Sequence, residues 1–280
     1  MTDIADAAAH RAEVDQWHAR RVAALTGPDG WLSVTGLFWL EPGETDVGSR
    51  GPVVLPAGPE RIGAIEVVEG GPVVRLDAGA PVTDAGGRGL EGEVELLTDR
   101  QTGGPAVLRV GSASFYVIDR EGRLAVRVKD SESPARRSFA GIDRYPVDLR
   151  WRVDACFEQH PPGATLLVPD VLGSAQTYRN PGSLRFDVDG RVCRLEAFQE
   201  PDEVELFVVF GDSTNGSGTF GGGRYLYAKP ADDRGRVVLD FNRAYNPPCV
   251  FTEHATCVLP LKVNRLPVAI EAGEKRYGRH

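Results

Sequence analysis

The sequence predicts a mainly β protein, in which one N-terminal helix precedes two packed antiparallel β units, a sandwich and then a barrel-like unit. Three observations predict this class. The 33 glycines and 20 prolines separate short apolar runs along the 280 residues, as the tight turns of an all-β protein require. Residues 4–26 are the one long segment with helical periodicity. Asp189-Gly190, a strong signal for a two-residue hairpin, separates two apolar runs.

The expected helix covers residues 4–26. Its alanine-rich start has high helix propensity, and a Gly-Pro pair follows its last apolar residue. Val14 and Leu25 fall on one apolar face. His10 and His18 are eight positions apart, which is too far for one metal ion, so we expect both on the surface.

Strands are expected to follow one another from residue 31 to about residue 245. The polar stretch 130–134 separates two strand groups and predicts a domain boundary. The predicted division is a helical segment 1–30, a sandwich-like unit 31–134 and a barrel-like unit 135–280. Beyond residue 245 the sequence is irregular and proline-rich but still carries many apolar residues, so we expect that segment to pack against the second unit.

Composition narrows the possible partners. A net charge of −8 and a pI near 5.3 imply long-range repulsion from nucleic acids and anionic membranes, so we expect neither as a partner. The first residues show no secretory signal, and no apolar run approaches a membrane span. These features predict a cytoplasmic protein with cysteines in the thiol form. They leave the oligomeric state open.

A glycine-rich stretch is the first candidate site. Six glycines lie between Gly211 and Gly223, with Asp212 near the start and Arg224 directly after them. Glycines beside Arg224 remove neighbouring side chains, so we expect its guanidinium to face open space and to hold a carboxylate or phosphate. The alternative is a glycine-rich hairpin in which Arg224 pairs with Asp212.

The second candidate is the run from Asp240 to Asn246. If a strand ends near residue 241, Asp240 and Asn242 point to one side of it, where polar groups commonly form the rim of a pocket. The alternative is that these side chains cap the turn before Pro247 through hydrogen bonds to the backbone.

The third candidate combines Cys249, Glu253, His254 and Cys257. The spacing offers three soft ligands within nine residues, but it lacks a fourth, and we predict no metal and no cofactor. Buried thiols are the expected state of the cysteines. A thiol redox pair of Cys249 and Cys257 remains an alternative.

These candidates define one predicted function, which is the binding of a small polar or anionic metabolite between the β units, with an enzymatic reaction that the sequence does not specify. We expect Asp212, Arg224, Asp240 and Asn242 to line one concave site. The predicted roles are catalysis by Asp212 and Asp240, and ligand binding by Arg224, Tyr225, Asn242, Tyr245 and Asn246. A non-catalytic ligand-binding or protein-interaction module is the alternative.

Several motifs carry a family resemblance. They are Gly36-Leu37-Phe38-Trp39-Leu40, the stretch from Gly211 to Leu226, the stretch from Asp240 to Cys249, Asn264-Arg265-Leu266-Pro267 and Ala272-Gly273-Glu274-Lys275. In type and order they resemble the bacterial and archaeal family catalogued as domain of unknown function 1684, over roughly residues 30–277. The resemblance implies no mechanism.

The N-terminal β unit is also similar to the phosphopeptide-binding forkhead-associated sandwich. The Ser-x-x-His pair and Asn-Gly loop of that family are absent from this region, so the similarity does not imply phosphothreonine binding.

Overall fold

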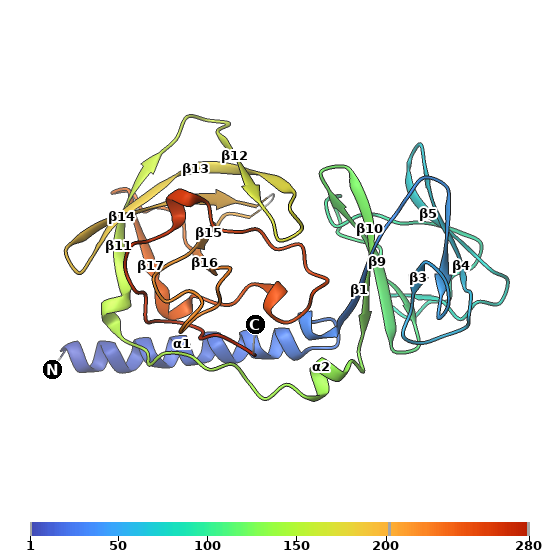
Figure 1. Ribbon diagram of the computed structural model, residues 1–280, viewed down its shortest axis with the longest axis horizontal. Helices are drawn as coiled ribbons and strands as arrows, with labels where there is room; N and C mark the ends of the chain where they lie inside the picture. Colours follow the sequence, from blue (N-terminus) through green and yellow to red (C-terminus); the bar gives the residue numbers. More distant parts are fainter. Residues whose placement is uncertain (1, 201–202, 279–280) are drawn as a thin grey trace. The chain divides into compact units, whose positions relative to one another are not determined.

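The computed structural model describes residues 2–200 and 203–278, and it confirms the mainly β class with an N-terminal helix (Figure 1). The chain divides into two compact units. Unit 1 comprises residues 1–23, 140–250 and 256–280, and unit 2 comprises residues 24–139 and 251–255. Whether these units correspond to independently folding domains with the predicted boundaries stays a prediction.

Unit 2 is built from two five-stranded sheets. The first has the order β1-β10-β9-β8-β6 and the second the order β3-β2-β4-β5-β7. Their strands are β1 (Val34–Trp39), β2 (Glu44–Gly48), β3 (Val53–Val54), β4 (Gly63–Val68), β5 (Gly71–Leu76), β6 (Thr83–Asp84), β7 (Glu93–Glu95), β8 (Leu108–Val110), β9 (Ala113–Arg120) and β10 (Arg123–Asp130). The short helix α2 (Pro134–Arg137) follows them.

The alternation of apolar residues places one face of each sheet in a shared core. Ile65 and Val74 come from one sheet and Phe115 and Val126 from the other, and all four are fully buried. Glu121 and Gly122 both have positive φ and form a compact two-residue turn between β9 and β10.

Unit 1 contains one strongly curved sheet of seven strands. Its main path is β16-β15-β14-β13-β11-β17, and β12 pairs with β13. These strands are β11 (Arg152–Gln159), β12 (Thr165–Pro169), β13 (Ala175–Val188), β14 (Arg191–Gln199), β15 (Leu206–Phe210), β16 (Arg224–Ala228) and β17 (Arg236–Asp240). Asp189 and Gly190 both have positive φ and form the expected two-residue turn between β13 and β14.

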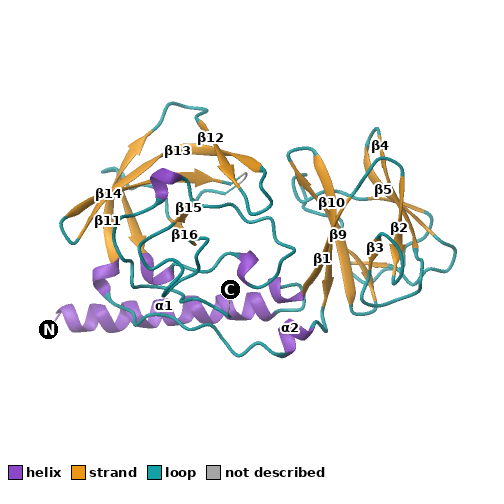
Figure 2. Cartoon of the chain, in the orientation of Figure 1, coloured by secondary structure: helices purple, strands orange, loops and turns teal. Residues whose placement is uncertain are grey.

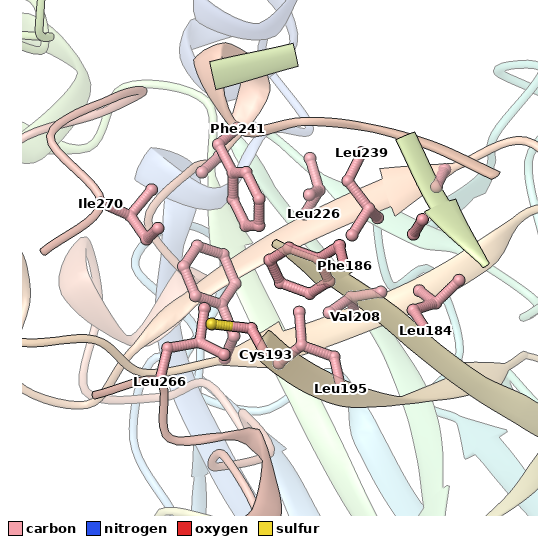
Figure 3. Packing of buried hydrophobic residues seen from close by; sticks show 14 of the residues in the cluster. Leu184, Phe186, Cys193, Leu195, Val208, Leu226, Leu239, Phe241, Leu266 and Ile270 are labelled. Carbon is pink, nitrogen blue, oxygen red and sulfur yellow. The ribbon is translucent and has the colours of Figure 1, made fainter. Parts of the chain in front are cut away.

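The concave face of this sheet holds the main core of unit 1 (Figure 3). Phe210 and Phe241 meet edge to face, with ring centroids 5.3 Å apart. Leu266 and Ile270, from the irregular C-terminal segment, complete the same cluster. That segment is mostly loop, interrupted by short 3-10 turns (Figure 2), yet it packs down as its apolar content predicts.

Helix α1 (Thr2–Thr26) belongs to unit 1 for most of its length. Val14 is fully buried, and the Trp17 and Tyr245 rings lie 6.3 Å apart. His10 is only 6% exposed, which corrects the expectation of a surface histidine. No helix in the described part of the chain is long and apolar enough to cross a bilayer.

Strand β2, strand β6 and the first half of β13 escape sequence reasoning because many of their residues are polar. The strand β2 carries two acidic residues, and the first half of β13 contains Gln176 and Asn180. Both amides are buried and bonded to backbone, Gln176 to Thr256 O at 3.2 Å and Asn180 to Ala197 O at 2.8 Å. These buried amides occupy inward-facing positions that are usually apolar, so the sequence lacks the alternating apolar pattern by which a strand is recognised.

Candidate functional site

The glycine-rich loop between β15 and β16 is folded on itself. Backbone donors of the loop find acceptors within it: the N–H groups of Ser217, Gly218 and Thr219 all bond to Thr214 O. The Asp212 carboxylate accepts from Thr214 N at 2.8 Å and from Ile270 N at 3.2 Å. These bonds leave few N–H groups for an anion, and the loop forms the glycine-rich hairpin of the alternative interpretation.

Gly223 is required by packing. Its φ is +91°, and a Cβ atom there would lie 2.6 Å from Phe210 O and 2.4 Å from Pro260 Cγ. This glycine therefore permits a close approach of backbone to its neighbours, as positive φ and crowding demand. It does not open space beside Arg224.

Arg224 is completely buried, so the expectation that it faces open space is wrong. Its Nη2 donates to Asp212 Oδ2 at 2.8 Å and to Ile270 O at 2.8 Å, and its Nη1 donates to the carbonyl of Ala272. The Asp212 side chain is also fully buried. The two residues form an internal ion pair that connects β16 to the C-terminal segment, and both side chains are 0% exposed.

Asp240 ends β17 and caps the following 3-10 turn, accepting from Asn242 N at 3.2 Å. Its carboxylate also accepts from Asn242 Nδ2 at 2.9 Å, and Arg243 Nε lies 3.2 Å from Oδ2. Asn242 is 3% exposed and bonds both backbone groups of Asp148, each at 3.0 Å. Asn242 therefore holds the backbone at Asp148, whereas Asp240 is 9% exposed and borders a cleft.

His10 of α1 approaches Asp240, with 3.6 Å between Nε2 and Oδ2. This separation exceeds a hydrogen bond but suits an ion pair when the imidazole is protonated. His10 also lines a cleft of about 660 Å³ between the first turns of α1 and residues 147–149. Sequence reasoning missed this pair because its members are 230 positions apart.

Asp240 lines a second cleft in unit 1, of about 550 Å³, which we call the β17 groove. It runs along the outer face of β11 and β17, where Arg152 lies directly opposite Asp240. Its lining residues are Glu13, Arg152, Asp154, Glu205, Tyr227, Ala228, Lys229, Pro230, Asp232, Arg236, Val238, Asp240 and Arg243.

Charged side chains of both signs surround the β17 groove. Arg236 pairs with Asp232 at 2.9 Å, and Arg243 contacts both Glu13 and Asp240. Among the described residues, neither Arg152 nor Lys229 has an ion-pair partner. The groove therefore presents cations that remain available to a ligand.

The tyrosines predicted to bind a ligand form an aromatic cluster. Tyr225 is buried and donates its hydroxyl to Val258 O at 2.9 Å. Tyr245 stacks on Tyr227 at 6.4 Å and lies under the Arg21 guanidinium at 4.3 Å. Burial raises the pKa of all three phenols, which stay neutral. Of these, Tyr227 lines the β17 groove, and sequence reasoning did not select it.

Asn246, the last predicted ligand contact, is fully buried beside Glu274. Its backbone N–H donates to Glu274 Oε2 at 2.7 Å, and its side-chain amide donates to Lys275 O at 2.8 Å. Arg21 of α1 completes this arrangement, 2.7 Å from Glu274 Oε1. The network attaches the helix to the C-terminal segment.

The structure thus separates the residues that were expected to line one concave site. Asp212 and Arg224 form one buried pair, Asn242 and Asn246 hold backbone segments, and Asp240 borders a cleft. The described residues include no group of three or more potential metal ligands. All four cysteines are thiols, with Cys193 and Cys257 buried and Cys156 exposed.

Comparisons with known proteins extend these observations. A family model described as a protein of unknown function (DUF1684) matches residues 137–275. A solution NMR structure of an uncharacterized protein from Haloarcula marismortui is 33% identical, with a TM-score of 0.43, and the match covers 51% of this chain and 80% of that chain. No curated protein matches. The family match starts well after residue 30, and the forkhead-associated similarity stays a prediction.

Proposed function

The chain belongs to the DUF1684 family, and from that premise we propose that unit 1 binds a small polar metabolite with at least one anionic group in the β17 groove. The observation that carries the proposal is the position of Arg152. It lies opposite Asp240 in the pairing of β11 with β17, lines the groove and has no ion-pair partner among the described residues.

The charge pattern defines the ligand class. A guanidinium offers a planar, permanently charged fork that suits a carboxylate or phosphate. Lys229 supplies a second available cation, and the Tyr227 ring forms part of the wall. The carboxylates of Asp154 and Glu205 line the same groove and suit a cationic or hydrogen-bond-donating group. A metabolite of mixed charge fits this lining better than a polyanion.

Acid–base chemistry is the enzymatic form of this proposal. Asp240 borders the β17 groove and His10 stands next to it, so a proton lost by a bound ligand has an acceptor nearby. Catalytic contacts are commonly long before a ligand binds, and the separation of 3.6 Å is compatible with that. Asn242 holds the carboxylate in place.

A non-catalytic binding function is favoured by a different observation. The Asp240 carboxylate already caps a 3-10 turn and contacts Asn242 and Arg243, so its lone pairs are largely occupied. The Asp240 carboxylate then stabilises the 3-10 turn and balances the charge of Arg243, and it takes no part in a reaction. In that case the β17 groove binds its ligand without converting it chemically.

The test is identification of metabolites that co-purify with the full chain, by native mass spectrometry followed by extraction. We expect an anionic or mixed-charge compound in stoichiometric amount. It should be lost in Arg152→Glu and kept in Arg194→Glu, which changes an exposed arginine of β14 outside the groove. Equal retention by both variants, or no retained compound and no thermal shift with a panel of anionic metabolites, would refute the proposal.

A further inference from the structure

Two of the four thiols are neighbours in unit 1. Cys249 lies in the 3-10 turn Pro248–Val250, and Cys257 lies eight positions later. The backbone N–H of Cys249 donates to Cys257 Sγ at 3.1 Å. We propose that Cys249 and Cys257 form a redox pair that a peroxide oxidises to a disulfide and that a dithiol reduces back to two thiols. This inference does not depend on the β17 groove.

Hydrogen bonds hold the backbone around Cys257 in place. Cys257 O accepts from Val171 N at 2.9 Å, and the next residue, Val258, accepts the Tyr225 hydroxyl at 2.9 Å. Because Cys257 Sγ already lies 3.1 Å from the backbone nitrogen of Cys249, a local movement of the two side chains can bring the sulfur atoms to the disulfide bond length of about 2.05 Å.

The difference in burial between the two cysteines indicates which thiol is oxidised first. Cys249 is partly exposed and Cys257 is buried, so the peroxide reaches Cys249 first. The Cys249 thiolate attacks a peroxide oxygen, the O–O bond breaks, and water leaves after proton uptake, which yields a sulfenic acid. The Cys257 sulfur then attacks the sulfenic sulfur, and the S–O bond breaks as a second water leaves. Two thiols are oxidised and one peroxide is reduced to two waters.

The local environment also sets the pH dependence. The hydrogen bond with Cys257, together with burial, raises the pKa of the Cys249 thiol. Since the thiolate is the reacting form, it is scarce at neutral pH, and the oxidation rate should rise about tenfold for each pH unit between pH 7 and pH 9. Oxidation at neutral pH is therefore slow, as suits a pair that responds to sustained oxidant.

The experiment uses the full chain, treated with hydrogen peroxide, alkylated and digested with trypsin. Cleavage after Arg243 and Lys262 leaves both cysteines in one peptide. Further cleavage after Glu253 separates the reduced peptide in two but leaves the oxidised pieces linked. We expect linked pieces that escape alkylation and are released by dithiothreitol, and a melting temperature about 5–10 °C higher for the oxidised chain.

Single variants make the assignment specific. In Cys257→Ser, Cys249 should stop at the sulfenic acid and be captured by dimedone, whereas Cys156→Ser, which removes an exposed thiol elsewhere, should form the link as wild type does. The peptide assay on the wild-type protein tests the proposal even if a cysteine variant fails to fold. Irreversible oxidation of Cys249 with Cys257 still alkylated, or no linked pieces at any pH from 7 to 9, would overturn the proposal.

Discussion

Replacement of Arg224 by methionine provides a strong test of how unit 1 is held together. Arg224→Met keeps most of the side-chain volume but removes the charge and every donor. Asp212, whose side chain is fully buried, then has no cation beside it, and the carbonyls of Ile270 and Ala272 lose their donor. The arginine lies on β16 and these carbonyls lie on the C-terminal segment, so their attachment is weakened.

The magnitude follows from burial. Removing one partner of a buried ion pair costs about 3–5 kcal/mol, because the remaining charge is left without compensation. A buried carbonyl without its donor costs about 1–3 kcal/mol more, although the two effects share one site and do not simply add. A loss of about 4 kcal/mol lowers the melting temperature by about 8–16 °C for a chain of this size class.

The assay is thermal and urea unfolding of the full chain, followed by circular dichroism. The matched control is Arg236→Met on β17, because Arg236 pairs with Asp232 while both side chains are about half exposed. An exposed pair contributes about 0–1 kcal/mol, so the control should melt within about 4 °C of wild type. The double variant Asp212→Asn with Arg224→Met should recover part of the lost stability, since it removes the orphaned charge.

A melting temperature for Arg224→Met within the range of the control would refute this reasoning. The same result with a lost thermal shift on addition of an anionic ligand would restore the ligand-contact role that the sequence predicts for Arg224.

Three further experiments test other parts of the molecule. Asn264 is fully buried and bonds Glu196 N at 2.7 Å and Val209 O at 2.9 Å, so Asn264→Ala should cost about 2–4 kcal/mol in urea unfolding, and a loss below about 0.5 kcal/mol would contradict this. Burial and the nearby Arg144 lower the pKa of His18 from its ordinary value of 6.5, so the native state binds fewer protons. The free energy of unfolding should therefore keep its full His18 contribution above pH 6.5 and decrease as the pH drops below it. If the free energy of unfolding of His18→Gln decreases equally steeply with falling pH, His18 is excluded as the source of the decrease. Elemental analysis of protein purified without added metal should show well under one zinc per chain, and about one zinc would show that a ligand set was overlooked.

Much of the candidate site lay beyond sequence reasoning for a physical reason. Arg224 follows three glycines, and this local pattern suggested open space, yet its acceptors lie on residues 212 and 270–272. The same holds for His10, whose neighbour Asp240 is 230 positions away. Local sequence describes which groups a residue carries, while burial depends on segments that are remote in the chain.

Local chemistry was sufficient where structure depends on neighbours in the chain. The turns at residues 121–122 and 189–190 need positive φ, which Asp-Gly and Glu-Gly pairs accommodate, and these hairpins were predictable. Helix α1 followed from its alanine-rich, periodic sequence. The irregular segment after residue 245 was expected to pack because its apolar residues have to leave water.

The sequence by itself therefore determined the mainly β class, the N-terminal helix, the hairpin turns and the packing of the apolar C-terminal segment. The tertiary structure alone decided that the Asp212–Arg224 pair is internal, that Asp240 and Arg152 face one groove, and that Cys249 and Cys257 touch. Strand propensity and turn geometry act over a few residues, whereas ion pairs, clefts and thiol contacts arise where the curved sheet, α1 and the C-terminal segment converge.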